Sequence, residues 1–268
     1  MQGKGQQSKQ GTVLVTGASA GLGYELAKQF GRNGWDLVLV ARDRKRLEQV
    51  ASEFGQAYGV TARVIAKDLS EPSSPAEIFA ELRDKHIHVD ILINNAGVGE
   101  YGPFLETDLQ KELQTIQVNM SSLTHLTKLF LPAMLERKRG KVMNVAAIAS
   151  VMPGPFTAVY FATKAYVLSF SEALSEELRG TGVTVTAFCP GVTRTEFARR
   201  SKMEGARIFA LPAMEAADVA GRGYRALMRG KAVSVPGVLN KVMVLMMGLT
   251  PRNLVRRMAK LLLGKPAR

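Results

Sequence analysis

The sequence predicts an α/β fold in which helices cover both faces of a doubly wound parallel sheet of about seven strands. Short apolar runs rich in β-branched residues alternate along the chain with longer amphipathic stretches. The short runs lack the alternation that a half-exposed strand shows, which indicates strands buried on both faces. The 268 residues, 46% of them hydrophobic, suffice for a single domain with one large core.

The individual elements follow from these runs. Strands are expected at 12–16, 36–41, 62–66, 90–94, 141–145, 183–188 and 232–235. Helical periodicity fills the intervals between them, at 22–33, 42–54, 75–85, 109–137, 159–179 and 216–228. The stretch 109–137 is expected to be one long helix with Pro132 near its last turns.

The two ends of the chain differ from the domain predicted over 12–235. Residues 1–11 are rich in Gly, Gln and Lys and contain no apolar segment, so a disordered tail is expected rather than a signal peptide. Residues 236–268 form a basic extension: they contribute seven positive charges and no acid to the net charge of +13, leaving +6 for the rest. The charge excess therefore indicates a property of the extension and does not favour nucleic acid as a partner.

The cysteine and histidine content argues against a metal centre. The chain has a single cysteine, Cys189, which excludes an internal disulfide and a zinc site made of cysteines. The three histidines, His86, His88 and His125, are scattered. We therefore predict no metal ligands in this protein.

A glycine-rich turn joins the first predicted strand to the first helix. It reads Gly17-x-x-x-Gly21-x-Gly23. Glycines allow the backbone to turn tightly and to approach a pyrophosphate, which the N–H groups at the start of a helix can bind. The alternative is a tight strand–helix turn that binds no ligand.

Tyr160 and Lys164 are four residues apart and share one face of a predicted helix. A tyrosine hydroxyl has a pKa near ~10, and a neighbouring ammonium group lowers it by favouring the phenolate. Such a tyrosine can donate and accept a proton at neutral pH. Taken alone, the pair is more often a solvated helix face.

The order and spacing of three motifs resemble the short-chain dehydrogenase/reductase family. They are the glycine turn, Asn94-Asn95-Ala96-Gly97 after the fourth strand, and Tyr160-x-x-x-Lys164, and the resemblance extends from about Gly11 to Val235. It implies a Rossmann-type fold and hydride transfer between a nicotinamide cofactor and a carbonyl or alcohol. Tyr160 would be the acid/base, Lys164 would lower its pKa and hold the nicotinamide ribose, and Asn119 would support a water. The family pairs its subunits through the long helices, which implies a homodimer or homotetramer.

The resemblance also implies the cofactor contacts. Asp68 and Leu69 would lie at the adenine, Asn95 near its ribose, and the Pro190-Gly191 segment at the nicotinamide. Strand 36–41 ends without an acidic residue at its tip, and the Arg42 guanidinium suits a 2′-phosphate, so NADP(H) is favoured over NAD(H). The full set is Gly17, Ser19, Ala20, Gly21, Leu22, Gly23, Arg42, Asp68, Leu69, Asn95, Ala96, Gly97, Tyr160, Lys164, Pro190, Gly191, Thr193 and Thr195.

One residue departs from the family pattern. The serine that orients the substrate oxygen usually stands thirteen residues before the tyrosine, where this chain has Ala147. Losing such a donor costs roughly 100- to 1,000-fold in turnover. Three interpretations stay open: an engineered Ser→Ala change, natural loss in a protein that only binds NADP(H), or replacement by Ser150 or by a substrate group. The intact remainder of the site favours a single change.

The substrate side is predicted to be apolar. A lid is expected at about 196–215, with Phe197, Ile208, Phe209, Leu211 and Met214. The loop 98–104 and the turn 152–156 are expected to supply the other walls, with Tyr101, Phe104 and Phe156 among their apolar residues. This composition predicts a hydrophobic ketone or aldehyde and its alcohol as substrates, unless these residues only pack the lid.

The extension shows apolar residues at helical spacing over 238–262, with Arg252, Arg256, Arg257 and Lys260 among them. A basic amphipathic helix suits an anionic membrane surface, whereas a partner subunit and the substrate mouth are the alternatives. The longest apolar run, 242–249, is too short to span a bilayer. We therefore expect a cytoplasmic oxidoreductase, peripheral on the inner face of a membrane. The rival interpretation is a non-catalytic NADP(H)-binding sensor or scaffold there.

Overall fold

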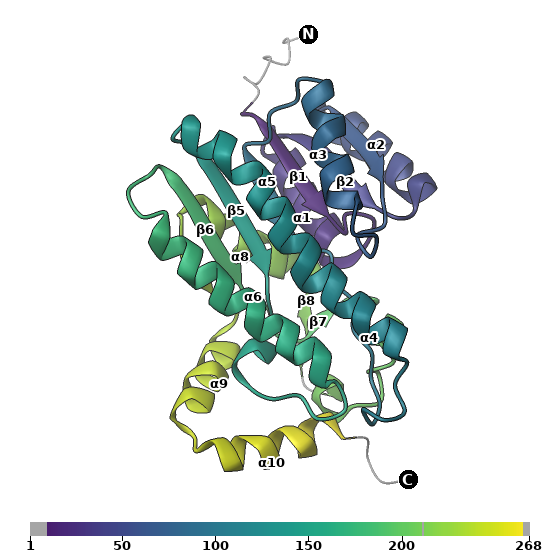
Figure 1. Ribbon diagram of the computed structural model, residues 1–268, viewed down its shortest axis with the longest axis vertical. Helices are drawn as coiled ribbons and strands as arrows, with labels where there is room; N and C mark the ends of the chain where they lie inside the picture. The colour runs from purple at the N-terminus through teal and green to yellow at the C-terminus, as the bar shows by residue number, and fades with distance from the viewer. Residues whose placement is uncertain (1–9, 211, 265–268) are drawn as a thin grey trace.

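A seven-stranded sheet forms the middle layer of the protein in the computed structural model, which describes residues 10–210 and 212–264 (Figure 1). All its pairings are parallel, in the order β3-β2-β1-β4-β5-β6-β9. The strands are β1 (Thr12–Thr16), β2 (Asp36–Ala41), β3 (Ala62–Ala66), β4 (Ile91–Asn94), β5 (Gly140–Val145), β6 (Val183–Phe188) and β9 (Val233–Ser234). The order reverses between β1 and β4, as in a Rossmann-type sheet, which confirms the predicted fold class.

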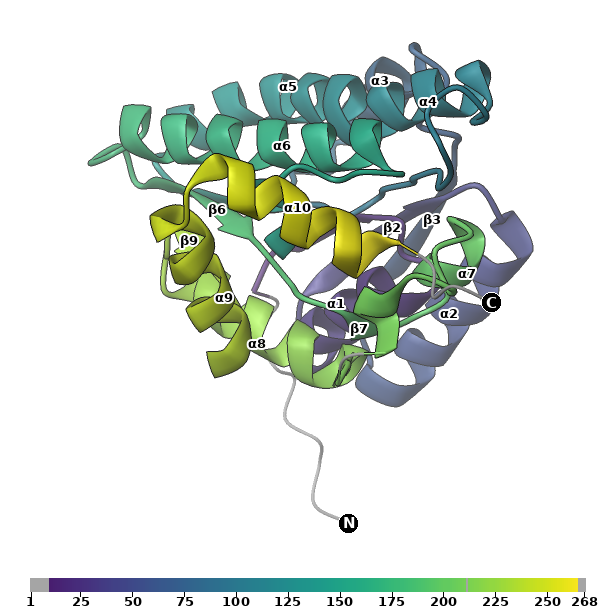
Figure 2. The same ribbon diagram turned by 90° about the horizontal axis from the view of Figure 1, so that it is seen from below.

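The strands are apolar on both faces because helices cover both. Figure 2 shows α1 (Gly21–Arg32), α2 (Arg44–Tyr58) and α8 (Ala216–Met228) on one side of the sheet. The other side carries α3 (Ser74–Asp84), α4 (Leu109–Ile116), α5 (Leu123–Glu136) and α6 (Ala158–Glu177). Successive β1 residues alternate between the two cores, since Val13 and Val15 pack with Phe30 while Leu14 packs with Leu92.

The predicted helix 109–137 is not regular. A π-helical segment, Gln117–Ser122, separates α4 from α5, and Asn119 lies within it. Pro132 lies inside α5 rather than at a break. Periodicity does not reveal a π-helical turn, because the apolar pattern on either side continues. Such turns are frequent at functional sites, where they re-aim a side chain.

Short elements close the carboxyl end of the sheet. They are 3-10 turns at Ile148–Val151 and Arg207–Ala210, α7 (Phe197–Arg200), and the two-stranded sheet of β7 (Thr193–Arg194) and β8 (Met214–Glu215). The extension forms α9 (Val238–Leu249) and α10 (Arg252–Leu263), which lie below this end of the sheet in Figure 1. None of the helices described is long and apolar enough to cross a membrane.

Several expectations fall on residues that the structure does not describe. They concern residues 1–9 of the expected tail, Leu211 of the lid, and Lys265 and Arg268 of the extension.

Candidate active site

A cleft of about 1230 Å³ opens at the carboxyl ends of the strands, where the strand order reverses. Ligands of open α/β sheets bind at this place. Every residue in the predicted cofactor set lines the cleft. The cleft continues past Tyr160 into an apolar chamber formed by the 3-10 turns, α7 and the C-terminal helices.

The glycine turn is shaped to receive an anion. Gly17 and Gly21 have φ of +67° and +56°, which favour glycine, and a Cβ at Gly23 would lie 2.2 Å from the Gly17 carbonyl oxygen. Helix α1 begins here with no side-chain cap and no acidic residue in its first turn. Its first N–H groups are therefore left for a ligand in the cleft, which fits the pyrophosphate of a dinucleotide.

Asn95 holds the segment after β4 against β1. Its amide donates to the Thr16 carbonyl oxygen at 2.9 Å, and the Thr16 hydroxyl accepts the N–H groups of Asn95 and Ala96 at 3.0 Å each. The side chain that the family resemblance places near the adenosine ribose thus also fixes the floor of the cleft.

A buried polar network below the cleft was not predicted. The Asn94 amide donates to Thr127 at 3.0 Å and to the Asn144 side-chain oxygen at 2.9 Å, and Asn144 donates to Ser171 at 2.9 Å. These four side chains are almost fully buried. Because β4, β5, α5 and α6 each contribute one of them, the network fixes how these elements sit relative to one another. The sequence signal that could have indicated this network is the pair Asn94 and Asn144, two polar residues near the ends of apolar strands.

Lys164 lies beneath Tyr160 and is 5% exposed. Its ammonium group donates to the Val145 carbonyl oxygen at 2.7 Å and lies 5.7 Å from the centre of the Tyr160 ring. Burial lowers the pKa of Lys164 to about 8, since the charged form loses its hydration.

The expected lowering of the Tyr160 pKa is wrong in this structure. Burial instead raises the pKa of Tyr160, because the phenolate would be desolvated. Lys164 points at the Val145 carbonyl and is itself less basic than usual, so its charge does not offset that cost. A positive charge placed on the open side of the ring would act in the opposite direction.

Asn119 braces the site from behind and does not line the cleft. Its side chain is 1% exposed, accepts the Val98 N–H at 3.0 Å, and donates to the Val98 carbonyl and to Thr163 at 2.9 and 3.0 Å. Gly97 lies against it, since a Cβ there would be 3.4 Å from both the Asn119 oxygen and the Lys164 nitrogen. The π-helical segment thereby links the β4 loop to α6.

Ala147 lines the cleft, and Ser150 does not replace a hydroxyl there. The Ser150 hydroxyl is buried, donates to the Lys164 carbonyl oxygen at 2.8 Å and accepts the Ala147 N–H at 3.4 Å. Ser150 is absent from the cleft walls, whereas Ala147, Ile148 and Ala149, the three residues before it, belong to them. Replacement by Ser150 therefore conflicts with the fold of the 3-10 turn.

Two arginines line the cleft at the end of β2. Arg42 forms an ion pair with Asp68 at 3.7 Å, and Arg46, which was missed, donates to the Ser19 carbonyl oxygen at 3.3 Å. Asp43 accepts the Arg46 backbone N–H at 2.9 Å as the N-cap of α2, so its carboxylate is engaged by the helix. The spacing of Arg42 and Arg46 by four residues was the signal that could have found the second arginine.

The apolar chamber differs in part from the predicted walls. Phe197 packs on Tyr160 with 5.2 Å between ring centres, and Ile208 and Phe209 line the chamber. Phe104 does not, because it is 64% exposed. Tyr101 and Phe156 pack against each other behind the wall, at 6.1 Å. Met152, from the expected wall 152–156, lines the chamber. Residues that the prediction of the walls lacked complete it: Phe161, Met203, Met243, Leu262 and Leu263.

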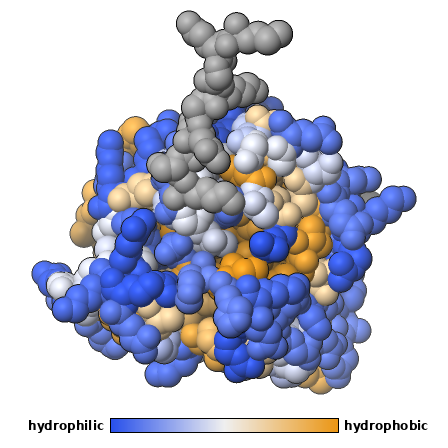
Figure 3. All heavy atoms as spheres, turned by 90° about the horizontal axis from the view of Figure 1, so that it is seen from above, coloured by the Kyte–Doolittle hydropathy of each residue, from blue (hydrophilic) through white to orange (hydrophobic). Residues whose placement is uncertain are grey.

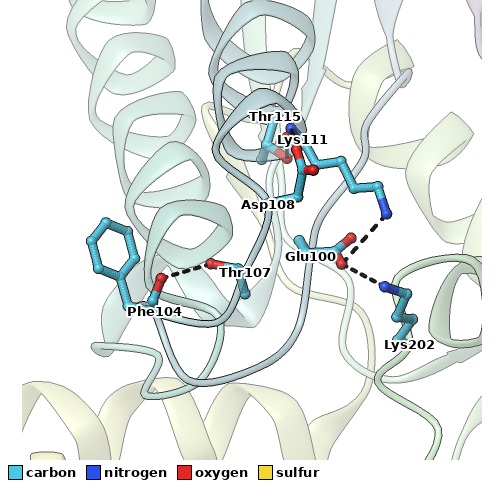
Figure 4. A network of polar contacts seen from close by, with 7 residues as sticks. All are labelled: Glu100, Phe104, Thr107, Asp108, Lys111, Thr115 and Lys202. Atoms are coloured by element: carbon cyan, nitrogen blue, oxygen red, sulfur yellow. Dashed lines mark hydrogen bonds and ion pairs between the residues drawn. The ribbon is translucent and has the colours of Figure 1, made fainter.

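The lid is tied to the loop before α4 through one carboxylate. Figure 4 shows the Glu100 carboxylate between Lys202 of the lid and Lys111 of α4, at 2.8 and 3.8 Å. The Glu100 side chain is 9% exposed, and its hydrogen bond raises the pKa of Lys202. A raised lysine pKa means that this contact is fully present at neutral pH and is lost only as the pH rises through that pKa.

Replacing Glu100 by Gln is expected to loosen the lid. Glutamine keeps the shape but removes the charge that holds Lys202, so KM for a carbonyl substrate should rise about threefold to tenfold while the Kd of the nicotinamide cofactor stays unchanged. Glu81→Gln, which removes the exposed ion pair with Lys85 on α3, is the matched control. Steady-state kinetics and proteolysis of 196–210 measure the effect, and equal behaviour of both variants would refute it.

Comparison with known proteins agrees with this geometry. A family model described as short chain dehydrogenase matches residues 11–205. The chain is 33% identical over 196 residues to very-long-chain 3-oxoacyl-CoA reductase from Anas platyrhynchos, a match that covers 71% of this chain and 62% of that enzyme's length, which is less than two thirds of it.

Solved structures match over most of the chain. The short-chain dehydrogenase from Sphingobium yanoikuyae in complex with NADPH is 32% identical, with a TM-score of 0.80 over 89% of this chain and 94% of that one. The bulky-bulky ketone specific alcohol dehydrogenase from Comamonas testosteroni is 30% identical, with a TM-score of 0.76 over 90% and 94%. The chain therefore belongs to the short-chain dehydrogenase/reductase family of oxidoreductases.

Proposed function

We propose that the protein is an NADP(H)-dependent oxidoreductase that interconverts a bulky hydrophobic ketone or aldehyde and its alcohol. The observation that carries the proposal is the position of Tyr160, whose ring stands between the glycine-turn end of the cleft and an apolar chamber. A proton donor at that point can serve a carbonyl carbon that lies next to the nicotinamide. The bound cofactor would supply or accept the hydride.

The protein's own residues divide the remaining work. Tyr160 gives its proton to the carbonyl oxygen in reduction and takes it back in oxidation. Lys164 holds the space below the ring, and its lowered pKa lets it exchange a proton near pH 8. Asn119 positions Val98 and α6, and Phe197 excludes water from the Tyr160 ring.

The proposed preference for NADP(H) rests on the two arginines at the adenine end. Both line the cleft, where Arg46 donates to the Ser19 carbonyl oxygen of the glycine turn and Arg42 pairs with Asp68. Asp43 caps α2, so its carboxylate is not left to bind the ribose hydroxyls. In support of this, the neighbour from Sphingobium yanoikuyae holds NADPH.

Replacing both Arg42 and Arg46 by Ala should weaken NADPH binding about tenfold to a hundredfold and leave NADH binding nearly unchanged. Each guanidinium that pairs with a phosphate loses a charge-assisted hydrogen bond. Arg44→Ala, which removes a neighbouring exposed arginine paired with Glu48, is the control. Fluorescence titration with the two cofactors measures the ratio, and an equal loss for NADPH and NADH would contradict the preference.

The substrate class rests on the chamber beyond Tyr160. Its walls are aliphatic, sulfur-bearing and aromatic side chains, which accommodate a large apolar group on the carbonyl better than a short polar one. In support of this, a related structure is that of an alcohol dehydrogenase described as specific for bulky-bulky ketones. NADPH oxidation with a graded series of ketones tests the proposal. Faster turnover of short polar ketones than of bulky ones would overturn it.

A second function is favoured by one observation. Ala147 leaves the cleft without the expected hydroxyl, and the Ser150 hydroxyl bonds to Lys164 instead. The rival function is therefore that of a sensor or scaffold, which binds NADP(H) without turnover.

We also expect pairing of subunits as a homodimer or homotetramer, because α4 exposes Leu109 and Leu113. Light scattering tests the latter.

A further inference from the structure

The two C-terminal helices cover the apolar chamber with their inner face. Met247 of α9 and Val255, Ala259 and Leu263 of α10 are buried in a cluster with residues of the 3-10 turns and α6. Two hydrogen bonds secure the end of α10: the Tyr101 hydroxyl donates to the Leu263 carbonyl at 2.5 Å, and the Arg207 N–H donates to Gly264 at 3.3 Å. The position of this pair is therefore fixed by the domain.

The outer face of the same helices is apolar and exposed. On α9 the side chains form one stripe at helical spacing: Val238, Leu239, Val242, Leu245, Met246 and Leu249. Leu245 and Leu249 are 63% and 73% exposed. Helix α10 adds Leu254, Met258 and Leu261 at the same spacing. Most of the exposed large hydrophobic side chains in the described part of the chain lie on this pair. Such a concentration marks an interaction surface.

The charges on this surface have one sign. Lys241, Arg252, Arg256, Arg257 and Lys260 are exposed on the pair, and no acidic residue occurs between 236 and 268. The opposite side of the molecule, seen in Figure 3, has a hydrophilic rim around a hydrophobic area. The basic apolar surface of α9 and α10 lies at the end where the chamber lies.

We propose that α9 and α10 dock on the surface of an anionic lipid bilayer. An apolar stripe flanked by Lys and Arg matches acyl chains below negatively charged headgroups, and each cation near such a surface adds to the attraction. A second copy of this chain would bring the same positive charges against them, since the net charge is +13. Charge complementarity thus favours lipid over self-association.

Docking would place the apolar chamber at the membrane. Met243 of α9 and Leu262 and Leu263 of α10 line the chamber from within, while their neighbours on the same helices face outward. A substrate dissolved in the bilayer would then reach the chamber between these helices and the lid. This second step rests on the proposed function; the docking itself does not.

Flotation of the full-length protein with phosphatidylcholine vesicles, with and without phosphatidylglycerol, tests the docking. We expect the protein to bind the anionic vesicles, and to bind the neutral ones at least about tenfold more weakly. Binding to the anionic vesicles should weaken as salt is added. Binding that is equal for both vesicle types, or absent from both, would overturn the proposal.

Two pairs of variants locate the contact. Leu245→Ser with Leu249→Ser should lower vesicle binding at least about tenfold. Leu109→Ser with Leu113→Ser, two exposed leucines four residues apart on α4, should not, when proteins of the same oligomeric state by light scattering are compared. Arg256→Glu with Arg257→Glu should also lower vesicle binding at least about tenfold. Arg32→Glu with Arg63→Glu makes an equal change in net charge at exposed positions outside α9 and α10, and should lower vesicle binding much less.

The outcomes separate the docking from the catalytic proposal. Flotation needs neither substrate nor turnover, so the docking proposal stands and the enzymatic one fails if the protein floats but neither it nor Ala147→Ser turns over. If the α9 variant leaves flotation unchanged but converts an oligomer to a monomer in light scattering, a second copy occupies the stripe and the docking proposal fails. Unfolding curves of each variant exclude loss of fold as the cause.

Discussion

Ala147→Ser raises turnover of a bulky ketone by roughly 100- to 1,000-fold, with little change in KM. This is the expected result because the residue lines the cleft beside the Tyr160 region and lacks only the hydroxyl that would donate to the developing oxyanion. A donor aimed at charge that develops in the transition state lowers the barrier without strengthening the ground state. The measurement is the initial rate of NADPH oxidation for both proteins under identical conditions.

Two control variants make the result specific. Ala149→Ser adds the same hydroxyl to another position of the cleft wall and should bring no such gain. Ser150→Ala should leave any residual turnover within a few-fold, since that hydroxyl bonds to the Lys164 carbonyl rather than to the cleft. If NADPH binds but neither the original protein nor Ala147→Ser turns over, the sensor interpretation stands and the enzymatic one fails.

The order of the elements could be predicted because each carries a local signal. The strand 183–188 and the helix 216–228 have the predicted boundaries, where continuous apolar runs and amphipathic periodicity end sharply. The glycine turn could be located because a strand–turn–helix context fixes where its N–H groups face. Every cofactor residue that motif matching assigned lines the cleft.

The features that the sequence could not predict depend on burial and on which hydrogen-bond partners the fold brings together. The π-helical turn contains Asn119, whose side chain forms hydrogen bonds to Val98 that join segments separated in the chain. Ser150 is three residues from Ala147, where the family has its serine, but the Ser150 hydroxyl donates to the Lys164 carbonyl oxygen in α6. The rise in the Tyr160 pKa likewise reflects burial, which spacing to Lys164 does not reveal.

Lys164→Met should abolish most activity and stabilise the fold at neutral pH. A buried lysine whose pKa falls from 10.5 to about 8 costs about 3 kcal/mol when it is protonated in the folded state. Methionine keeps the length of the side chain and loses the hydrogen bond to Val145, worth about 1 kcal/mol. A net gain of about 2 kcal/mol in the free energy of unfolding is expected, with turnover reduced about 100-fold or more.

The pH dependence distinguishes this cause from better packing. Because the folded pKa is lowered, the unfolded chain binds more protons between pH 8 and 10.5, so the stability of the original protein rises with pH through that window. The advantage of Lys164→Met should therefore be greatest below pH 8 and should fade towards pH 10.5. Lys128→Met on α5, an exposed lysine, should change stability by less than about 0.5 kcal/mol at either pH. Urea unfolding at pH 7 and pH 10 measures all three proteins. An advantage of Lys164→Met that does not vary with pH would show that burial of the charge is not its source.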